Sequence, residues 1–261
     1  MSMYSPRRHP RVIAHRGGAL LAPENSWEAL EKCAELGLSY VETDAHLTAD
    51  GEVVLIHDPI LDRVCDASGL VSNHTWSDLR EVRITGSSRG LIRFSDALAA
   101  FPDTVFNVDA KSESVAIPLV DVIRNARALN RVCVASFDSR RLRRMRAHEP
   151  GLYTSLGQAE IASLVVAAQF TVSPNRVRIP GPSEGIAAVQ VPLIHKRIPV
   201  VTRRFVATAH AYGLPVHVWT LNERDEMVEA LNLGVDAIIT DEPVLAREVI
   251  NEFVIARYGS Q

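Results

Sequence analysis

Apolar residues fall into two spacings that alternate along the whole chain. Short runs rich in Val and Ile predict strands at residues 11–16, 40–48, 53–58, 105–111, 132–138, 152–156, 187–192, 215–221 and 237–241. Longer segments with apolar residues three or four positions apart predict helices at residues 27–37, 94–102, 114–130, 139–150, 158–170, 201–213, 223–234 and 243–253. Ser26 is placed to cap the first helix, and Asp50-Gly51 predicts a hairpin turn before residues 53–58.

This alternation sets the predicted architecture. The run at 53–58 is interpreted as an extra partner of the second strand, which leaves eight successive strand–helix units. Such units form parallel sheets, and eight of them in 261 residues predict an α/β fold, one closed (β/α)8 TIM barrel. The predicted domain is 1–261, with a small, turn-rich insertion at about residues 59–92. An open doubly wound sheet is the alternative, but no GxGxxG or Walker-type loop favours it.

Composition then narrows the classes of partner. The chain has 28 Lys and Arg against 31 Asp and Glu, a net charge of −3, so we expect no nucleic-acid partner. No apolar run reaches about 18 residues, so no membrane span is predicted. The amino-terminal stretch lacks the apolar core of a secretory signal, and the three cysteines are widely spaced, so a cytoplasmic location is expected. Association into a homo-oligomer is left open.

Carboxylates gather at the ends of neighbouring predicted strands, where barrels of this kind place their chemistry. Glu42 and Asp44 stand two positions apart and share one strand face, as do Asp109 and Lys111. Adjacent strands lie about 4.8 Å apart, so the three carboxylates can converge, and buried carboxylates repel unless a cation compensates. A divalent cation such as Mg²⁺ or Ca²⁺ is one compensation, and salt bridges to Arg16 and Lys111 are the other. Residue spacing alone does not decide between a bound cation and salt bridges.

Two histidines end predicted strands close to this cluster. His15 ends the first strand and His57 ends the 53–58 run, and imidazole is the side chain best suited to exchange protons near pH 7. A pair beside carboxylates can serve as base and acid on one reacting centre, so both are candidate catalytic residues; structural histidines are the alternative. Arg16 offers a planar guanidinium suited to phosphate oxygens.

The motifs around these residues resemble those of one family. HRGG at 15–18, PENS at 23–26, ETDAHLTADG at 42–51 and HDPILDR at 57–63 occur in the order found in glycerophosphodiester phosphodiesterases. The resemblance continues with FNVDAK at 106–111, VWTLN at 218–222 and GVDAIITDEP at 234–243, and spans residue 12 to about residue 245. The amino-terminal motifs are specific in combination, although none of them is specific alone.

The resemblance implies a (β/α)8 barrel that cleaves a small-molecule glycerophosphodiester to glycerol 3-phosphate and an alcohol, with a divalent cation (Mg²⁺ or Ca²⁺) as cofactor. It also implies that the insertion covers the mouth of the barrel. The site residues it implies are the metal ligands Glu42, Asp44 and Asp109, the catalytic His15 and His57, and the substrate-binding Arg16, Lys111 and Trp219.

One position departs from the family pattern, which usually has glutamate where this chain has Asp109. Aspartate is one methylene shorter, so the cation is expected to sit differently or to be reached through water. The hypothesised mechanism uses the substrate's own glycerol 2-hydroxyl as nucleophile. One histidine deprotonates it, the other protonates the leaving alcohol, and water opens the resulting cyclic phosphate. Both assignments of base and acid remain open.

Three other functions fit parts of the pattern. A phosphodiesterase for lysophospholipids or sphingolipids would use the same barrel, and an apolar rim or a membrane helix would distinguish it; the sequence shows neither clearly. A barrel that binds a phosphate ligand without cleaving it is favoured by Asp109 alone. An unrelated metal-dependent hydrolase is expected to use several histidine ligands, whereas this cluster is rich in carboxylates.

Overall fold

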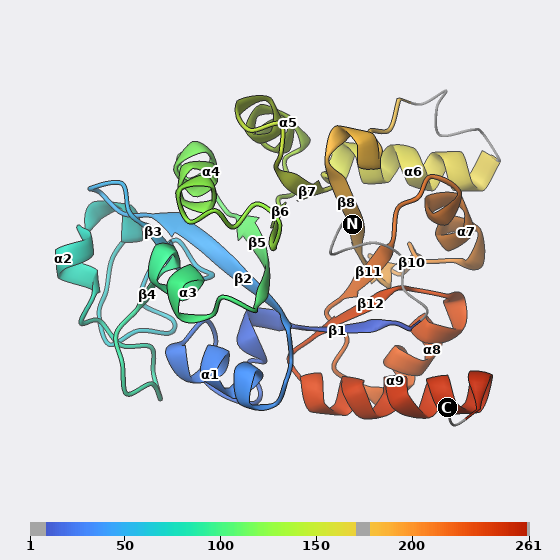
Figure 1. Ribbon diagram of the computed structural model, residues 1–261, viewed down its shortest axis with the longest axis horizontal. Coiled ribbons are helices and arrows are strands. Elements are labelled where there is room, and N and C mark those ends of the chain that lie inside the picture. Colours follow the sequence, from blue (N-terminus) through green and yellow to red (C-terminus); the bar gives the residue numbers. More distant parts are fainter. Residues whose placement is uncertain (1–8, 171–177, 260–261) are drawn as a thin grey trace.

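The computed structural model describes residues 9–170 and 178–259; residues 1–8, 171–177 and 260–261, which the predicted domain of 1–261 includes, lie outside the description. In the described chain eight parallel strands close into a barrel (Figure 1). Their order around the ring is β1 (Arg11–Ala14), β2 (Tyr40–Leu47), β5 (Val105–Ala110), β6 (Val132–Ala135), β7 (Tyr153–Ser155), β8 (Ile186–Pro192), β11 (Val216–Trp219) and β12 (Ala237–Thr240). Because β1 pairs with both β12 and β2, the predicted TIM barrel is confirmed.

Helices cover the outside of the ring (Figure 1). They are α1 (Trp27–Glu35), α3 (Phe94–Ala100), α4 (Ala116–Asn125), α5 (Ser139–His148), α6 (Gln158–Phe170), α7 (Arg203–Ala211), α8 (Arg224–Leu233) and α9 (Pro243–Tyr258). The helix predicted at 114–130 is shorter because Arg127 adopts a φ of +53°, which a continuing α-helix does not allow. None of the helices in the described residues combines the length and the apolar character needed to traverse a bilayer.

The turn between β1 and α1 is held close to the helix. Ser26 caps α1 as predicted, since its Oγ accepts a hydrogen bond from the backbone N–H of Ala29 at 3.1 Å. Gly17 has a φ of +81°, and a Cβ added there would lie only 2.7 Å from the Cβ of Ala29. Glycine is therefore required at this position, and the His15-Arg16 turn is packed directly onto α1.

The insertion leaves the barrel through two antiparallel strands. β3 (Val53–Leu55) pairs with β2 across the predicted Asp50-Gly51 turn, and β4 (Ile92–Arg93) pairs with β3. Between them lie the short helix α2 (Trp76–Leu79) and an apolar cluster of the insertion's own, to one side of the barrel (Figure 1). The insertion's members of that cluster are Leu61, Val64, Val71, Leu79, Ile84 and Leu91.

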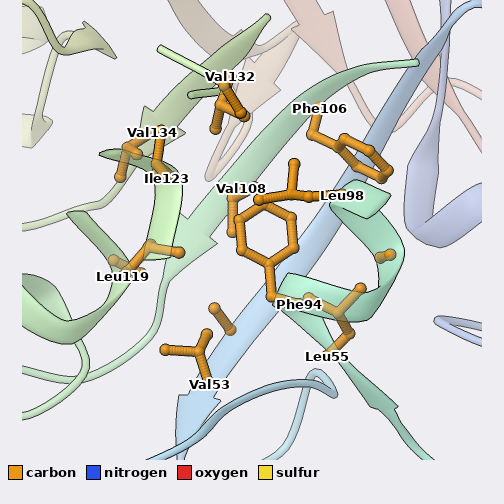
Figure 2. Packing of buried hydrophobic residues seen from close by; sticks show 14 of the residues in the cluster. Val53, Leu55, Phe94, Leu98, Phe106, Val108, Leu119, Ile123, Val132 and Val134 are labelled. Carbon is orange, nitrogen blue, oxygen red and sulfur yellow. The ribbon is translucent and has the colours of Figure 1, made fainter. Parts of the chain in front are cut away.

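Alternation along β5 separates the core from the barrel interior. Phe106, Val108 and Ala110 pack outward against the helices, and Phe94 of α3 meets Phe106 edge to face with ring centroids 5.7 Å apart (Figure 2). Side chains on a strand alternate between faces, so Asn107 and Asp109 point into the barrel instead. The same apolar burial that attaches the helices thus fixes the direction of the polar residues.

Candidate active site

A cavity of about 420 Å³ opens at the carboxyl ends of the barrel strands. All eight site residues inferred from the sequence line it, so the structure brings the whole predicted set together. Seven of them come from β1, β2, β3 and β5 or the residues that follow these strands, and we call them the charged wall: His15, Arg16, Glu42, Asp44, His57, Asp109 and Lys111.

Strand register places two aspartates of the charged wall side by side. Asp44 on β2 is the direct partner of Asp109 on β5. The Lys111 ammonium lies between them, with its Nζ 2.7 Å from Asp44 Oδ1 and 2.8 Å from Asp109 Oδ2. Burial lowers the pKa of Lys111, but the two carboxylates outweigh burial and raise it, so this lysine stays charged. The salt bridges that the sequence analysis left open are therefore present.

The two aspartates differ in how well their charge is stabilised. Burial favours a higher pKa at Asp44, but Lys111 and a 3.0 Å hydrogen bond from Asn25 Nδ2 outweigh it, so the pKa is lowered. The Nε of Arg16 lies 3.5 Å from the same carboxylate. At Asp109 burial prevails over Lys111 and the pKa is raised. Asp44 is therefore the more firmly ionised of the pair.

Glu42 is a buried carboxylate with little compensating charge. Its Oε2 accepts a hydrogen bond from the Arg16 backbone N–H at 3.1 Å and lies 3.8 Å from His15 Nε2. Burial first, and then the charge of Asp44, raise the pKa of Glu42 to about 8. Hard divalent cations prefer oxygen ligands, so Glu42 and Asp44 have the chemistry of a cation site that needs one more positive charge. Across residues 9–170 and 178–259, however, no three His, Cys, Asp or Glu side chains are arranged as a metal-ligand group.

His15 is held by a carboxylate that the sequence analysis did not assign to the site. Its Nδ1–H donates to Asp241 Oδ1 at 2.7 Å, and Asp241 is held in turn by Asn222 Nδ2 at 2.8 Å. Burial lowers the pKa of His15, but the hydrogen bond to Asp241 and the charge of Glu42 outweigh burial and raise it. With Nδ1 occupied, the neutral ring presents the lone pair of Nε2, so His15 is oriented as a proton acceptor.

His57 is held in the same way by its neighbour. Its Nδ1–H donates to Asp58 Oδ1 at 2.6 Å, and Asp58 also accepts a hydrogen bond from Arg63 Nε of the insertion. The hydrogen bond from Arg63 is the main reason that the pKa of Asp58 is lowered to about 2. Arg63 also binds Glu24 through both terminal nitrogens, at 2.7 and 3.1 Å. The two histidines therefore have matching orientations on one cavity.

The sequence analysis did not assign the orienting carboxylates Asp58 and Asp241 to the site. The contact between His15 and Asp241 joins residues 226 positions apart, which spacing does not reveal, whereas Asp58 directly follows His57 in the sequence. Their signal was present: each follows a quoted strand end, in HDPILDR and in GVDAIITDEP. The insertion contributes Arg63 to this network, but none of the described residues 59–92 is among those that line the cavity. The insertion reaches the charged wall through Arg63, and the expectation that it covers the mouth of the barrel stays a prediction.

The opposite side of the cavity is built differently. Trp219 at the end of β11 lines it and meets Phe137 edge to face, with ring centroids 6.0 Å apart. Beyond Trp219 the lining comes from β6, the β7–α6 region, β8 and the segment before α7. We call the large apolar residues among them the apolar wall: Phe137, Leu156, Ile161, Val165, Val191 and Val200. The same elements also contribute Ser136, Ser155, Gln158, Gln190 and His195 to the lining.

Comparison with known proteins identifies the family of this chain. The model of the glycerophosphoryl diester phosphodiesterase family matches residues 15–245. A Mycobacterium tuberculosis protein named probable glycerophosphodiester phosphodiesterase 2 is 35% identical over 241 residues, covering 92% of this chain and 90% of its own. A rat lysophospholipase D is 26% identical over 270 residues, covering 92% and 86%.

A solved structure has the same fold. It is an Oleispira antarctica phosphodiesterase in complex with the product sn-glycerol-3-phosphate, 21% identical, with a TM-score of 0.74 and coverage of 93% of this chain and 97% of its own. At this identity the likeness shows the fold alone. The family match over most of the sequence and the 35% identity to a relative that is covered over 90% of its length go further. The chain therefore belongs to the glycerophosphoryl diester phosphodiesterase family and is an enzyme, a phosphoric diester hydrolase.

Proposed function

We propose that the enzyme hydrolyses glycerophosphodiesters to glycerol 3-phosphate and an alcohol at the charged wall. The observation that carries the proposal is the pair His15 and His57, each bound through Nδ1 to a carboxylate and both lining one cavity. Arg16 and Lys111 line the same cavity and supply positive charge for a phosphate between the two imidazoles. A general acid and a general base on one anion site are what phosphodiester cleavage needs.

The nucleophile in this proposal is the glycerol 2-hydroxyl of the substrate. One histidine takes its proton at Nε2 while the hydroxyl oxygen attacks phosphorus, and the other histidine protonates the oxygen of the leaving alcohol. The product of this step is a cyclic phosphate, and water then opens it with the two histidines in exchanged roles. Attack within one molecule avoids the entropy cost of bringing in a second reactant, which is worth several kcal/mol, up to about 7–11 in well-oriented cases.

A divalent cation belongs to the same proposal. Glu42, Asp44 and Asp109 would hold it, and the raised pKa of Glu42 is the feature of this chain that favours added positive charge. When bound, such a cation supplies Lewis-acid stabilisation of negative charge on the phosphate oxygens. Arg16, Lys111 and Trp219 line the same cavity. The two cationic side chains would bind phosphate oxygens, and Trp219 would pack against the glycerol. Mg²⁺ and Ca²⁺ both suit an all-oxygen set of ligands.

The test is a panel of glycerophosphodiesters with choline, ethanolamine, glycerol or inositol as the alcohol. Each is incubated with the full chain in EDTA and then with Mg²⁺, Ca²⁺ or Mn²⁺ in excess, and products are followed by ³¹P NMR. We expect glycerol 3-phosphate to form, preceded by a cyclic phosphate, in the presence of at least one of these cations. Binding of glycerol 3-phosphate without cleavage in any condition would favour a barrel that only binds phosphate ligands and would contradict the proposal.

A further inference from the structure

Helix α5 carries two pairs of arginines whose surroundings differ. Arg141 and Arg144, three positions apart, both reach the carboxylate of Glu113, at 3.3 and 2.8 Å. Arg143 and Arg146, also three positions apart, instead line a second pocket. Residues three apart are neighbours on a helix surface, so this second pair concentrates positive charge on one pocket.

The second pocket has a volume of about 470 Å³ and lies between α5 and α6, which are neighbours on the outside of the barrel (Figure 1). Residues of the segment that precedes β8 complete its lining. We call it the arginine pocket. Its polar lining in the described chain consists of Arg143, Arg146, Glu160, Ser163, Arg178 and Glu184.

The arginine pocket is separate from the active site. Ser155 of β7 lines the active-site cavity, whereas the preceding Thr154 accepts a hydrogen bond from Arg146 Nη1 at 2.5 Å. Strand β7 therefore lies between the two cavities. Among the described residues, none lines both of them. A ligand in the arginine pocket would therefore leave the charged wall accessible.

The positive charge in this pocket is incompletely matched. Burial lowers the pKa of Arg146, and Glu160 and Glu184 counteract burial only from a distance. Within the part of the chain that the structure describes, Arg143 pairs with Glu160 at 3.6 Å, while neither Arg146 nor Arg178 forms an ion pair. A half-buried guanidinium without a paired carboxylate loses hydration and gains no counter-ion in return. An anion from solution would supply that counter-ion.

The two carboxylates of the pocket already have backbone partners. Glu160 Oε2 accepts a hydrogen bond from the Gly157 N–H at 3.1 Å, and Glu184 Oε2 accepts one from the Gly181 N–H at 3.0 Å. Each carboxylate therefore holds a turn in place and is not free to move onto an arginine. The three guanidinium groups exceed the two carboxylates by one positive charge.

We propose that the arginine pocket binds a phosphate group, with Arg146 and Arg178 as its main ligands. A guanidinium donates two parallel hydrogen bonds to phosphate oxygens, and a phosphate has enough oxygens to engage more than one guanidinium, whereas one guanidinium already satisfies a carboxylate. Free inorganic phosphate and a phosphate monoester share this chemistry. The inference does not rest on the proposed function, because it uses no residue of the charged wall.

The rest of the pocket is suited to the polar body of a phosphate monoester. A volume of about 470 Å³ lies within the range of roughly 300–1,000 Å³ typical of pockets that hold small molecules. Ser163 and Glu184 line it beside the arginines. A hydroxyl and a carboxylate can both accept hydrogen bonds from sugar or polyol hydroxyls. A sugar phosphate is therefore a suitable probe for the monoester.

The test is a set of calorimetric titrations with inorganic phosphate, glucose 6-phosphate and glucose into the full chain. They are made at about 0.15 M salt, where distant surface charges are screened. The charged wall offers phosphate a site of its own under the proposed function, so the arginine pocket is measured as the binding that its variants lose. Arg146→Gln and Arg178→Gln should each weaken this binding about tenfold or more, because each removes a charge-assisted contact.

Arg140 provides the matched control on the same helix. It is exposed and is not among the residues that line either cavity, so Arg140→Gln removes the same charge from α5 and should bind all three probes like the native chain. Arg146 is half-buried, and its replacement can weaken folding. Arg178 is exposed, so Arg178→Gln tests the same pocket without that risk.

The three probes separate the sources of the phosphate group. Tighter binding of glucose 6-phosphate than of inorganic phosphate would identify a phosphate monoester as the ligand, and equal affinities would identify free phosphate; both support the site. Identical isotherms for the native chain, Arg146→Gln and Arg178→Gln would overturn the inference, and so would glucose binding as tightly as glucose 6-phosphate.

Activity measurements keep the arginine pocket apart from the charged wall. Arg178→Gln should change kcat/KM for glycerophosphocholine less than twofold, because Arg178 does not line the active-site cavity. If no glycerophosphodiester is cleaved, the proposed function fails, while the titrations still support or overturn the phosphate site. If the titrations show no loss in the variants, the site fails and the proposed function stands.

Discussion

The two walls of the cavity arise from different halves of one barrel. The charged wall comes from the first three barrel strands and β3, where carboxylates, histidines and cations lie within a few ångströms of one another. The apolar wall comes from later strands and from α6, and its members are Leu, Ile, Val and Phe. Among the described residues of the lining, His195 is the one titratable side chain that this later half supplies.

This difference suggests that the charged wall carries out the reaction and that the apolar wall influences which substrate is accepted. Strand register fixes the charged wall, because the pairing of β2 with β5 sets Asp44 directly opposite Asp109 and alternation directs Glu42 to the same face. Most of the apolar wall lies on a helix face and on loops, which can change in sequence without disturbing the register; Val191 on β8 is the exception. Substitutions in the first wall are therefore expected to act on every substrate, whereas substitutions in the second should act according to the apolar part of the substrate.

The largest expected effect is the loss of either histidine of the charged wall. His15→Ala and His57→Ala should each lower kcat about 10³-fold or more, because general acid–base catalysis typically contributes 10²–10⁴-fold per group. Circular dichroism melting curves close to those of the native chain serve as the folding check. Near-normal turnover in either variant would show that its imidazole does not carry protons in the reaction.

A change of leaving group assigns the two roles. With the p-nitrophenyl ester of glycerol 3-phosphate, the leaving phenolate needs no proton, so the variant lacking the general acid should recover most of its rate. The variant lacking the general base should stay slow. Recovery of both variants, or of neither, would contradict a mechanism in which one histidine donates and the other accepts.

Much of the charged wall could be predicted from the sequence. Alternation on β2 and β5 directs Glu42, Asp44 and Asp109 into the barrel, and the remaining residues of the charged wall lie in the motifs shared with the family. Asp241 could not be placed on His15 from spacing, because this contact depends on how β12 closes onto β1. The nearly continuous apolar run of α6 was visible in the sequence, but only the barrel shows which of its residues line the cavity. Helix ends such as that of α4 depended on a single left-handed residue, Arg127.

The next largest effect is expected from the cation that Glu42 and Asp44 are proposed to bind. Adding Mg²⁺ or Ca²⁺ should raise the melting temperature of the native chain, because the buried charges of Glu42 and Asp44 then gain a counter-ion. In Glu42→Gln we expect most of this shift to disappear and activity to fall roughly 10²-fold, in line with the loss of Lewis-acid stabilisation. Glu35→Gln at the exposed end of α1 is the matched control. It should keep the full shift in melting temperature and the activity of the native chain. If the cation raised the melting temperature of both variants equally, the cation would not be bound by Glu42.

The orienting carboxylates should have smaller effects than the histidines they hold. Asp241→Asn and Asp58→Asn are expected to lower kcat/KM about 10- to 100-fold, the range seen when a side chain that orients a functional group is lost. Because Asp241 raises the pKa of His15, its replacement should also move the corresponding limb of the pH profile to lower pH. Asp225→Asn on the exposed surface of α8 removes the same charge and should change neither the rate nor the profile. A lower rate with an unmoved profile would assign Asp241 a structural role only.

The smallest expected effect concerns stability, and it contrasts a buried histidine with an exposed one in the later half of the barrel. Burial lowers the pKa of His217 on β11 to about 4, against 6.5 for an exposed imidazole. Above pH 6.5 the ring is neutral in both states; as the pH falls from 6.5 to 4, only the unfolded chain takes up the proton, so stability is lost. The loss approaches about 3 kcal/mol at about 1.4 kcal/mol per pH unit.

His210 on α7 should show the opposite sign. Its hydrogen bond to Asp236 raises its pKa, so its contribution to stability is complete below pH 6.5 and is lost as the pH rises through the raised value. Urea unfolding at several pH values, compared between the native chain, His217→Gln and His210→Gln, isolates each contribution. His217→Gln should flatten the acid side of the stability curve and His210→Gln the neutral side. Parallel curves for all three proteins would show that neither histidine is linked to folding.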